Sequence, residues 1–228
     1  MSDSIHILVV AAHPDDAELA LGGGIAAWVK AGLRVTVACC SVSEGSPELA
    51  ARRRQAAQDA AAILGYQLLW VVPGDERQVE NIPEYRLVGL FDELVREVRP
   101  DLVISHWDGD SHGDHRRVAY AIAASARTWP DVALLQFGPN EHRAPSYGQF
   151  TSTVFVPMSE YIDRKTTALA AYSYEGQGYR PLDTAGVALR NRALGTQCGV
   201  EACEGLRLVR VVASTRGARG LARLLTDL

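Results

Sequence analysis

An apolar run near the start of the chain limits the fold more than any other feature of the sequence. The run from Ile5 to Ala12 is dominated by Ile, Leu, Val and Ala, and it lacks the regular polar alternation of a strand with one exposed face. Such a run is typical of a strand that is buried on both faces, as in parallel sheets covered by helices. The sequence therefore predicts a parallel sheet between helical layers.

The apolar run ends in the segment Ala12-His13-Pro14-Asp15-Asp16. Pro14 suits the first position of a following helix, because its missing N–H would be unpaired there in any case. His13 and Asp16 are three residues apart across this corner, so their side chains can converge on one point, while Asp15 is expected to point elsewhere. The corner predicts a chemical site at the carboxyl end of the first strand.

A second polar cluster, from Ser105 to His115, follows the apolar run 102–104. The chain has six histidines, and four of them lie in the two clusters: His13, His106, His112 and His115. A random distribution would rarely gather them in this way. The two clusters are therefore expected to form one site.

Strand-like and helix-like segments alternate along the first part of the chain. Strands are expected at 5–12, 33–40, 67–72 and 102–105, and helices at 17–31, 48–64, 83–98 and 114–127. Beyond residue 129 the pattern is looser, with strands expected at 153–156 and 206–212, helices at 159–172 and 219–225, and long loops at 137–149 and 173–191. Loops of this length are typical of binding loops or lids.

This alternation predicts a Rossmann-like α/β fold with three layers (αβα) and a mostly parallel, twisted sheet, in one domain that spans residues 1–228. In the strand order 3-2-1-4, the first and fourth strands are neighbours, and ligands bind outside their carboxyl ends. This topology would bring the 13–16 corner close to the 112–115 segment.

Composition and charge exclude several kinds of partner. A formal net charge of −4 gives no basic surface for nucleic acid or an anionic membrane. No apolar stretch approaches the roughly 18 residues of a spanning helix, and the first residues lack a secretory pattern, so a cytoplasmic protein is expected.

The spacing of Cys39, Cys40, Cys198 and Cys203 favours small buried thiols over a disulfide or metal site. The sequence leaves open whether the protein forms a homo-oligomer.

A dinucleotide site is not expected, although it is common in such folds. It needs a glycine-rich turn directly after the first strand, where Asp15 and Asp16 would instead repel phosphate. The glycines at 22–24 come too late, within the expected helix, and are better explained by close packing.

Two imidazoles and a carboxylate match a catalytic zinc site, which has three protein ligands and a fourth position for water. Such a site lowers the pKa of a bound water to about 7. Amide hydrolysis also needs a group that takes the proton of the water and one that stabilises the oxyanion, and Asp15 and His112 remain for these tasks. The same donors accept Fe²⁺, Mn²⁺ or Co²⁺, so the metal stays open.

The two motifs resemble those of the LmbE/PIG-L family of zinc-dependent N-acetylglucosaminyl deacetylases, especially its bacterial GlcNAc-malate deacetylase-like branch. The family signature is Ala-His-Pro-Asp-Asp after the first strand and His-Pro-Asp-His further on. Here the second motif is His112-Gly113-Asp114-His115, with glycine in place of the usual proline. An Arg-rich helix before Gly65 and the segment 202–206 extend the resemblance. It implies a hydrolase that removes acetyl from an N-acetylated amino sugar or an N-acetylglucosaminyl conjugate.

Carried over residue by residue, the resemblance implies that His13, Asp16 and His115 hold Zn²⁺ and that Asp15 is the general base. His112 would stabilise the oxyanion, and Asp114 would orient and charge His112. The candidates for binding the small-molecule substrate are Arg53, Arg54, Glu44, Trp107 and Asp110. Departures from the family pattern near 55 and 173–174 leave the identity of the sugar open.

Simpler interpretations stay open for single residues. Asp16 can be a helix-capping residue, and Asp110 can shape its loop or orient a catalytic histidine. His106 can support the metal ligands or only pack at the strand end. For the whole chain, the alternatives are a non-catalytic sugar-binding module and a metal-dependent hydrolase of another acyl amide or ester.

Overall fold

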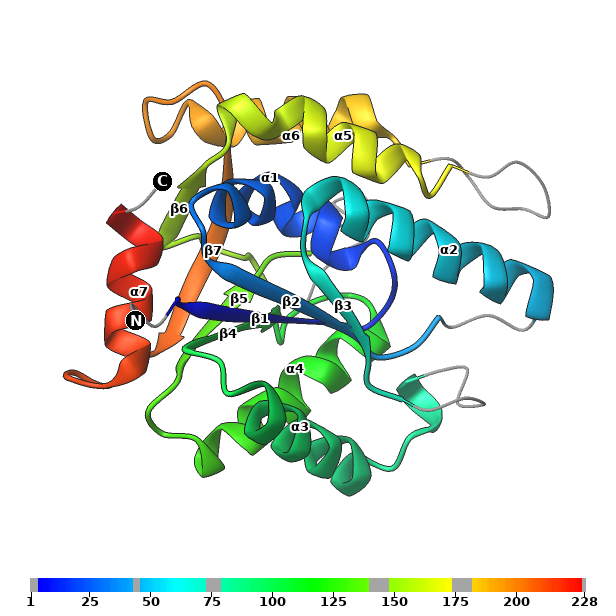
Figure 1. Ribbon diagram of the computed structural model, residues 1–228, viewed down its shortest axis with the longest axis vertical. Helices are drawn as coiled ribbons and strands as arrows, with labels where there is room; N and C mark the ends of the chain where they lie inside the picture. Colours follow the sequence, from blue (N-terminus) through cyan, green and yellow to red (C-terminus); the bar gives the residue numbers. More distant parts are fainter. Residues whose placement is uncertain (1–3, 43–45, 73–78, 140–147, 174–181, 227–228) are drawn as a thin grey trace.

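Seven strands of the computed structural model form one sheet in the order β3-β2-β1-β4-β5-β7-β6 (Figure 1). The structure describes residues 4–42, 46–72, 79–139, 148–173 and 182–226. The strands are β1 (His6–Ala11), β2 (Arg34–Cys39), β3 (Gln67–Trp70), β4 (Leu102–His106), β5 (Ala133–Phe137), β6 (Val154–Pro157) and β7 (Cys203–Arg210). β1 to β5 are parallel, and β7 is antiparallel to both β5 and β6. The predicted mostly parallel sheet and the predicted order 3-2-1-4 are confirmed.

Helices cover both faces of the sheet (Figure 1). One face carries α1 (Asp16–Lys30), α2 (Pro47–Leu64) and α5 (Ile162–Ala170), with α6 (Thr184–Gly195) packed on α5. The other face carries α3 (Glu84–Val98) and α4 (Gly113–Ser125). α7 (Arg216–Thr226) contacts β4 and β5, and short 3₁₀ turns occupy Val79–Asn81, Ala126–Thr128 and Ser159–Tyr161. These layers match the predicted αβα architecture.

β1 is buried along its whole length and separates two apolar cores. Ile7 and Val9 face the core that includes α1 and α2, whereas Leu8 and Val10 face the core that includes α3 and α4. Successive side chains of a strand point to opposite faces, so a strand between two helical layers needs apolar residues at every position. This arrangement confirms the interpretation of the first apolar run.

Two elements differ from the sequence predictions. β5 was not expected, although its residues are buried and mostly apolar. α6 begins at Thr184, inside the segment 173–191 that was expected to be a loop, and the Asp183 carboxylate caps it by accepting the N–H of Gly186 (2.8 Å). Residues 140–147 of the other expected loop lie outside the described part of the chain.

The three glycines of α1 allow a buried ion pair to reach the backbone of this helix. Glu204 accepts hydrogen bonds from the N–H groups of Gly23 (3.0 Å) and Gly24 (2.7 Å). Lys165 donates to Glu204 (2.6 Å) and to the carbonyl of Leu19 (2.8 Å), and the side chains of Lys165 and Glu204 are fully buried. A Cβ atom at Gly23 would lie 2.7 Å from Met158 Cβ. Close packing therefore explains the glycines, as predicted.

The cysteines are free thiols. Cys39, Cys40 and Cys203 are buried as expected, but Cys198 is exposed, and its Sγ lies 3.8 Å from Sγ of Cys203. Among the residues that the structure describes, no helix has the length and apolar character needed to cross a membrane.

Candidate metal centre

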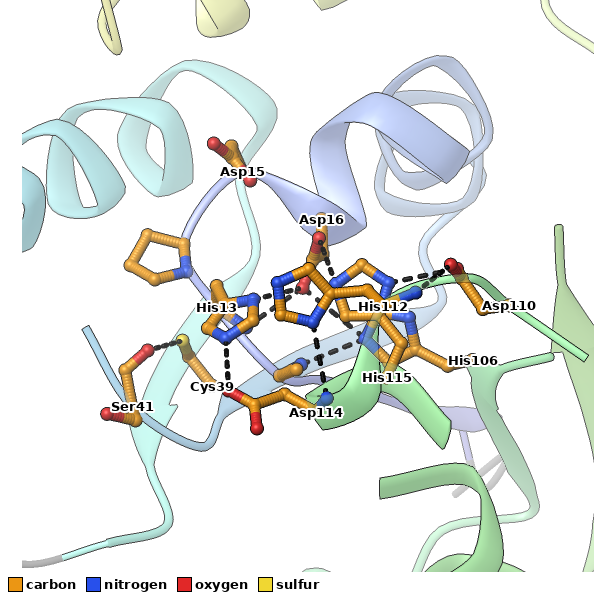
Figure 2. A network of polar contacts seen from close by, with 12 residues as sticks. His13, Asp15, Asp16, Cys39, Ser41, His106, Asp110, His112, Asp114 and His115 are labelled. Carbon is orange, nitrogen blue, oxygen red and sulfur yellow. Dashed lines mark hydrogen bonds and ion pairs between the residues drawn. The ribbon is translucent and has the colours of Figure 1, made fainter. Parts of the chain in front are cut away.

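The carboxyl ends of β1 and β4 bring the two polar clusters together (Figure 2). A tight turn after β1 begins the site: Asp15 has φ 90°, a left-handed conformation that is uncommon for a residue other than glycine. The N–H of His13 donates to Asp16 Oδ2 (2.9 Å), and the N–H of Leu19 donates to the Asp15 carbonyl (2.8 Å). α1 starts at Asp16 with Asp15 as its N-cap. Pro14 thus precedes the helix instead of occupying its first position.

His13 and His115 both lie beside the carboxylate of Asp16. His13 Nδ1 lies 3.6 Å from Asp16 Oδ2, and His115 Nε2 lies 3.3 Å from Asp16 Oδ1. Two ligand atoms bound to one tetrahedral zinc ion at about 2.1 Å lie about 3.4 Å apart. All three side chains are buried. The spacing and the chemistry of these donors therefore fit a divalent metal ion.

Each of the two histidines is held by a second aspartate at its other ring nitrogen. His115 Nδ1 lies 2.9 Å from Asp110 Oδ2, and His13 Nε2 lies 2.9 Å from Asp114 Oδ2. A ring N–H donated to a carboxylate leaves the opposite nitrogen as a lone pair, which is the arrangement of metal-binding histidines. The opposite nitrogens of the two rings are those that face Asp16, and this strengthens the fit to a metal ion.

The charges around His115 favour a cation at this point. Burial disfavours the charged imidazolium, but Asp16 and Asp110 outweigh it and raise the pKa of His115 to about 10. Burial alone would raise the pKa of Asp16, but His115 and His106 lower it well below its usual value. The site therefore stabilises positive charge beside an ionised Asp16.

His106 belongs to this centre, although the sequence left its role undecided. Burial and the neighbouring His115 lower the pKa of His106 to about 4, so the ring is neutral. Its Nε2 accepts the N–H of Ala12 (2.9 Å), and the ring stacks on His115 with centroids 4.0 Å apart. Asp16, His106 and His115 form one set of ligand atoms within 4.8 Å, and His13, His112 and His115 form another. Because Nε2 of His106 is already an acceptor, this ring suits a supporting role.

The structure corrects the implied relation between Asp114 and His112. The carboxylate of Asp114 contacts His13, and only its backbone N–H reaches His112, at Nδ1 (3.2 Å). Partial burial and the imidazoles of His115 and His13 lower the pKa of His112. This lowering of the pKa favours the neutral imidazole of His112, whereas the family resemblance implies a charged one. Its exposed ring stacks on His115, with centroids 4.4 Å apart.

Arg53 lies behind the turn that carries Asp15. Its buried guanidinium donates to the carbonyls of Val42 (2.7 Å) and Pro14 (3.3 Å), and it lies 3.9 Å from Asp15 Oδ2. Burial and the charge of Asp16 raise the pKa of Asp15 well above its usual value, and Arg53 partly opposes this shift. The structure therefore places Arg53 against Asp15 and the protein backbone and not at a surface open to a sugar.

The other predicted substrate-binding residues do not share one surface: some face the protein interior and one borders a cavity. Asp110 is turned inward, because its oxygens accept from His115 and from the N–H of His112 (2.9 Å), so the structure differs from the predicted sugar contact. The guanidinium of Arg54 lies over the Trp70 ring, 4.5 Å from its centroid. Trp107 is buried and borders an open cavity next to the site. Glu44 lies outside the described residues.

Known proteins share this sequence pattern and this fold. A family model described as PIG-L, GlcNAc-PI de-N-acetylase, matches residues 8–126, which contain both histidine clusters. A Bacillus anthracis protein named "Probable N-acetyl-alpha-D-glucosaminyl L-malate deacetylase 2" is 27% identical over 189 residues, which cover 76% of this chain and 82% of that protein.

Two solved structures show the same fold. N,N'-diacetylchitobiose deacetylase from Pyrococcus horikoshii has a TM-score of 0.74 at 20% identity, covering 91% of this chain and 84% of that chain. GalB, a 4-carboxy-2-hydroxymuconate hydratase from Pseudomonas putida, has a TM-score of 0.72 at 22% identity, covering 92% of this chain and 99% of that chain. The fold therefore occurs in proteins named for different reactions, and the function must be argued from the site.

Proposed function

Because this chain belongs to the PIG-L family, we propose that it is a metal-dependent hydrolase that removes acetyl from an N-acetylated amino sugar or an N-acetylglucosaminyl conjugate. The reaction cleaves a linear amide C–N bond and releases acetate and the free amine. The observation that carries this proposal is the pair of carboxylate contacts that leave one nitrogen of His13 and one of His115 facing Asp16. The proposed substrate is a small molecule in the cytoplasm.

His13, Asp16 and His115 would hold Zn²⁺, which favours imidazole and carboxylate ligands, and Fe²⁺, Mn²⁺ or Co²⁺ would suit the same donors. When bound, the ion polarises the acetamide carbonyl and lowers the pKa of a water molecule. Asp110 and Asp114 fix the two imidazoles, and His106 supports His115 from β4. This chain thus provides a rigid set of donors.

Asp15 is the proposed general base. Its burial raises the pKa of the carboxyl group, and a base is most effective when its pKa is close to the working pH. Asp15 takes a proton from the attacking water and passes it to the leaving nitrogen. Arg53 holds the turn that presents this carboxylate.

His112 is the proposed oxyanion donor. Its Nδ1 accepts the N–H of Asp114, so in the neutral ring the proton is on Nε2 and is available to an oxygen that gains negative charge. A neutral His112 can donate to the oxyanion in this way, and it does not need the charge from Asp114 that the family resemblance implies.

Acetate release from N-acetylglucosamine, its malate and inositol conjugates and N-acetylated aminoglycosides tests the proposal. Activity on at least one substrate, lost with a chelator and restored by Zn²⁺, is the expected result. A non-catalytic sugar-binding module would bind these compounds without releasing acetate, and a hydratase would act on none of them. The absence of acetate from every substrate with the metal-loaded protein would overturn the proposal.

A further inference from the structure

The turn between α6 and β7 brings two cysteines together. α6 ends at Gly195, and β7 begins at Cys203 (Figure 1). Sγ of Cys198, in the turn, lies 3.8 Å from Sγ of Cys203, and both residues are free thiols. A disulfide bond is about 2.05 Å long, so the two sulfur atoms would need to approach by about 1.8 Å. Rotation of the two side chains about their Cα–Cβ bonds can supply an approach of this size.

The backbone of the turn holds the two cysteines in this position. The N–H of Val200 donates to the carbonyl of Gly195 (3.1 Å), and Gly199 has φ 72°, a left-handed conformation that suits glycine and reverses the chain. A Cβ at Gly195 would lie 2.6 Å from the carbonyl oxygen of Val200, so this close approach requires glycine. Asn191 Nδ2 donates to the carbonyl of Cys203 (2.9 Å). The pair is therefore part of a defined turn.

The two thiols differ in their access to solvent. Cys198 is exposed, whereas Cys203 is fully buried. Burial, with a further contribution from Cys198, raises the pKa of the Cys203 thiol, which therefore stays protonated. An oxidant in solution reaches Cys198 first, and Cys203 lies beside the product. An accessible cysteine next to a resolving cysteine is the arrangement of redox-sensitive pairs.

We propose that Cys198 and Cys203 form a reversible disulfide when the protein meets a peroxide. The sulfur of Cys198 attacks one oxygen of hydrogen peroxide, the O–O bond breaks, and Cys198 becomes a sulfenic acid as one water molecule leaves. The sulfur of Cys203 then displaces the hydroxyl group of the sulfenic acid, which leaves with the thiol proton as a second water molecule. The two thiols lose two electrons, and one peroxide is reduced. The inference does not depend on the proposed hydrolase activity.

The disulfide would protect Cys198 from irreversible damage. A sulfenic acid without a neighbouring thiol is oxidised further to sulfinic and sulfonic acids, which thiol reductants do not reverse. Capture by Cys203 ends this sequence at a bond that a dithiol reduces. The bond also joins the end of α6 to the first residue of β7, next to Glu204 and its contacts with α1.

Peptide mapping of the folded, full-length protein tests the proposal. Trypsin releases both cysteines in one peptide, 193–207, and a glutamate-specific protease cuts between them, after Glu201. The protein is treated with hydrogen peroxide, and the remaining thiols are alkylated under denaturing conditions before digestion. We expect the 193–207 peptide to lose two hydrogens, to escape alkylation and to stay linked after cleavage at Glu201. Dithiothreitol should restore both thiols.

Two variants test the separate roles of the thiols. Cys203→Ala is expected to accumulate a sulfenic acid at Cys198, which dimedone traps, and then the sulfinic acid. Cys198→Ala is expected to leave the buried Cys203 unoxidised. Cys39 and Cys40, which are both buried, lie in the separate tryptic peptide 35–52 and provide the internal control. Thermal unfolding checks that both variants fold, and the wild-type map decides the question if either does not.

Several results would overturn the inference. One is irreversible oxidation of Cys198 in the wild type without an intramolecular disulfide. Another is a bond between two chains, seen as a dimer on a non-reducing gel. Equal trapping by dimedone in the wild type and in Cys203→Ala would show that Cys203 does not capture the sulfenic acid. Acetate release enters none of these measurements, so the proposed function can fail or stand separately.

Discussion

Asp110 Oδ2 lies 2.9 Å from His115 Nδ1, and this contact fixes which nitrogen of the ring can bind a metal ion. Asp114 has the same relation to His13. Figure 2 shows Asp110 and Asp114 at different edges of the site. Because both rings are held before any ion binds, little side-chain freedom remains to be lost when the metal is taken up.

The substitution Asp110→Asn is expected to weaken metal binding by about 10- to 100-fold, because the amide is a weaker acceptor for the His115 N–H. Competition with a chromophoric chelator measures the affinity. Asp108→Asn is the matched control, since Asp108 is in the same loop but is exposed and pairs with Arg207 (3.0 Å). Equal affinity in both variants would show that Asp110 does not position His115.

The substitution Asp15→Asn is expected to lower kcat by about 10²- to 10⁴-fold while the bound metal remains stoichiometric, because it removes the base but no ligand. Acetate release and elemental analysis measure the two quantities. Asp59→Asn, at an exposed position of α2, provides the control. Near-normal turnover of a metal-loaded Asp15→Asn enzyme would exclude Asp15 as the base.

The substitution Arg53→Met separates support of Asp15 from contact with the sugar. If Arg53 holds the turn that carries Asp15, kcat falls by about 10- to 100-fold, since small displacements of reacting groups are costly, and KM changes little. A sugar-binding role would instead raise KM. Arg52→Met, at the exposed neighbouring position, is the control, and thermal unfolding checks that both variants fold.

The substitution Gly23→Ala is expected to destabilise the protein by about 1 to 3 kcal/mol, because the new Cβ would meet Met158 in a packed core. Gly89→Ala, on α3, is the matched control, because a Cβ at this position has no neighbour within 4 Å. This change should stabilise the helix by up to about 1 kcal/mol. Urea unfolding measures both values, and a similar loss at the two positions would contradict the packing argument for α1.

His6 is expected to make stability depend on pH. Burial and the charge of Arg34 lower the pKa of His6 in the folded state, so below about pH 6.5 the unfolded chain takes up the proton first. Stability contributed by neutral His6 is present above this range and falls as the pH decreases towards the folded-state pKa. Urea unfolding at pH 7.5 and 5.5 should show a smaller loss for His6→Gln than for the wild type. An equal loss would assign the pH dependence to other groups.

The sequence predicted the elements whose residues repeat a simple pattern. β1 and β4 were recognisable as apolar runs, and the topology rule for parallel sheets joined His13 to His115. β5 and α6 were missed because β5 lies in a less regular part of the chain, and the apolar residues of α6 do not gather on one face of the helix. Side-chain directions were predicted least well. The contact of Asp114 with His13, across 101 positions of the chain, depends on how α4 docks, which no local pattern contains.

β7 follows the six other strands in the chain but lies inside the sheet, between β5 and β6. Its Glu204 also receives the N–H groups of Gly23 and Gly24 in the first helix. On the ribosome, therefore, the sheet cannot be completed until β7 has been synthesised. Until then, the N–H groups of Gly23 and Gly24 in α1 lack the Glu204 carboxylate that accepts them. A chain that is interrupted before this strand would expose the glycine face of α1 and the unpaired edge of β5, both of which invite aggregation.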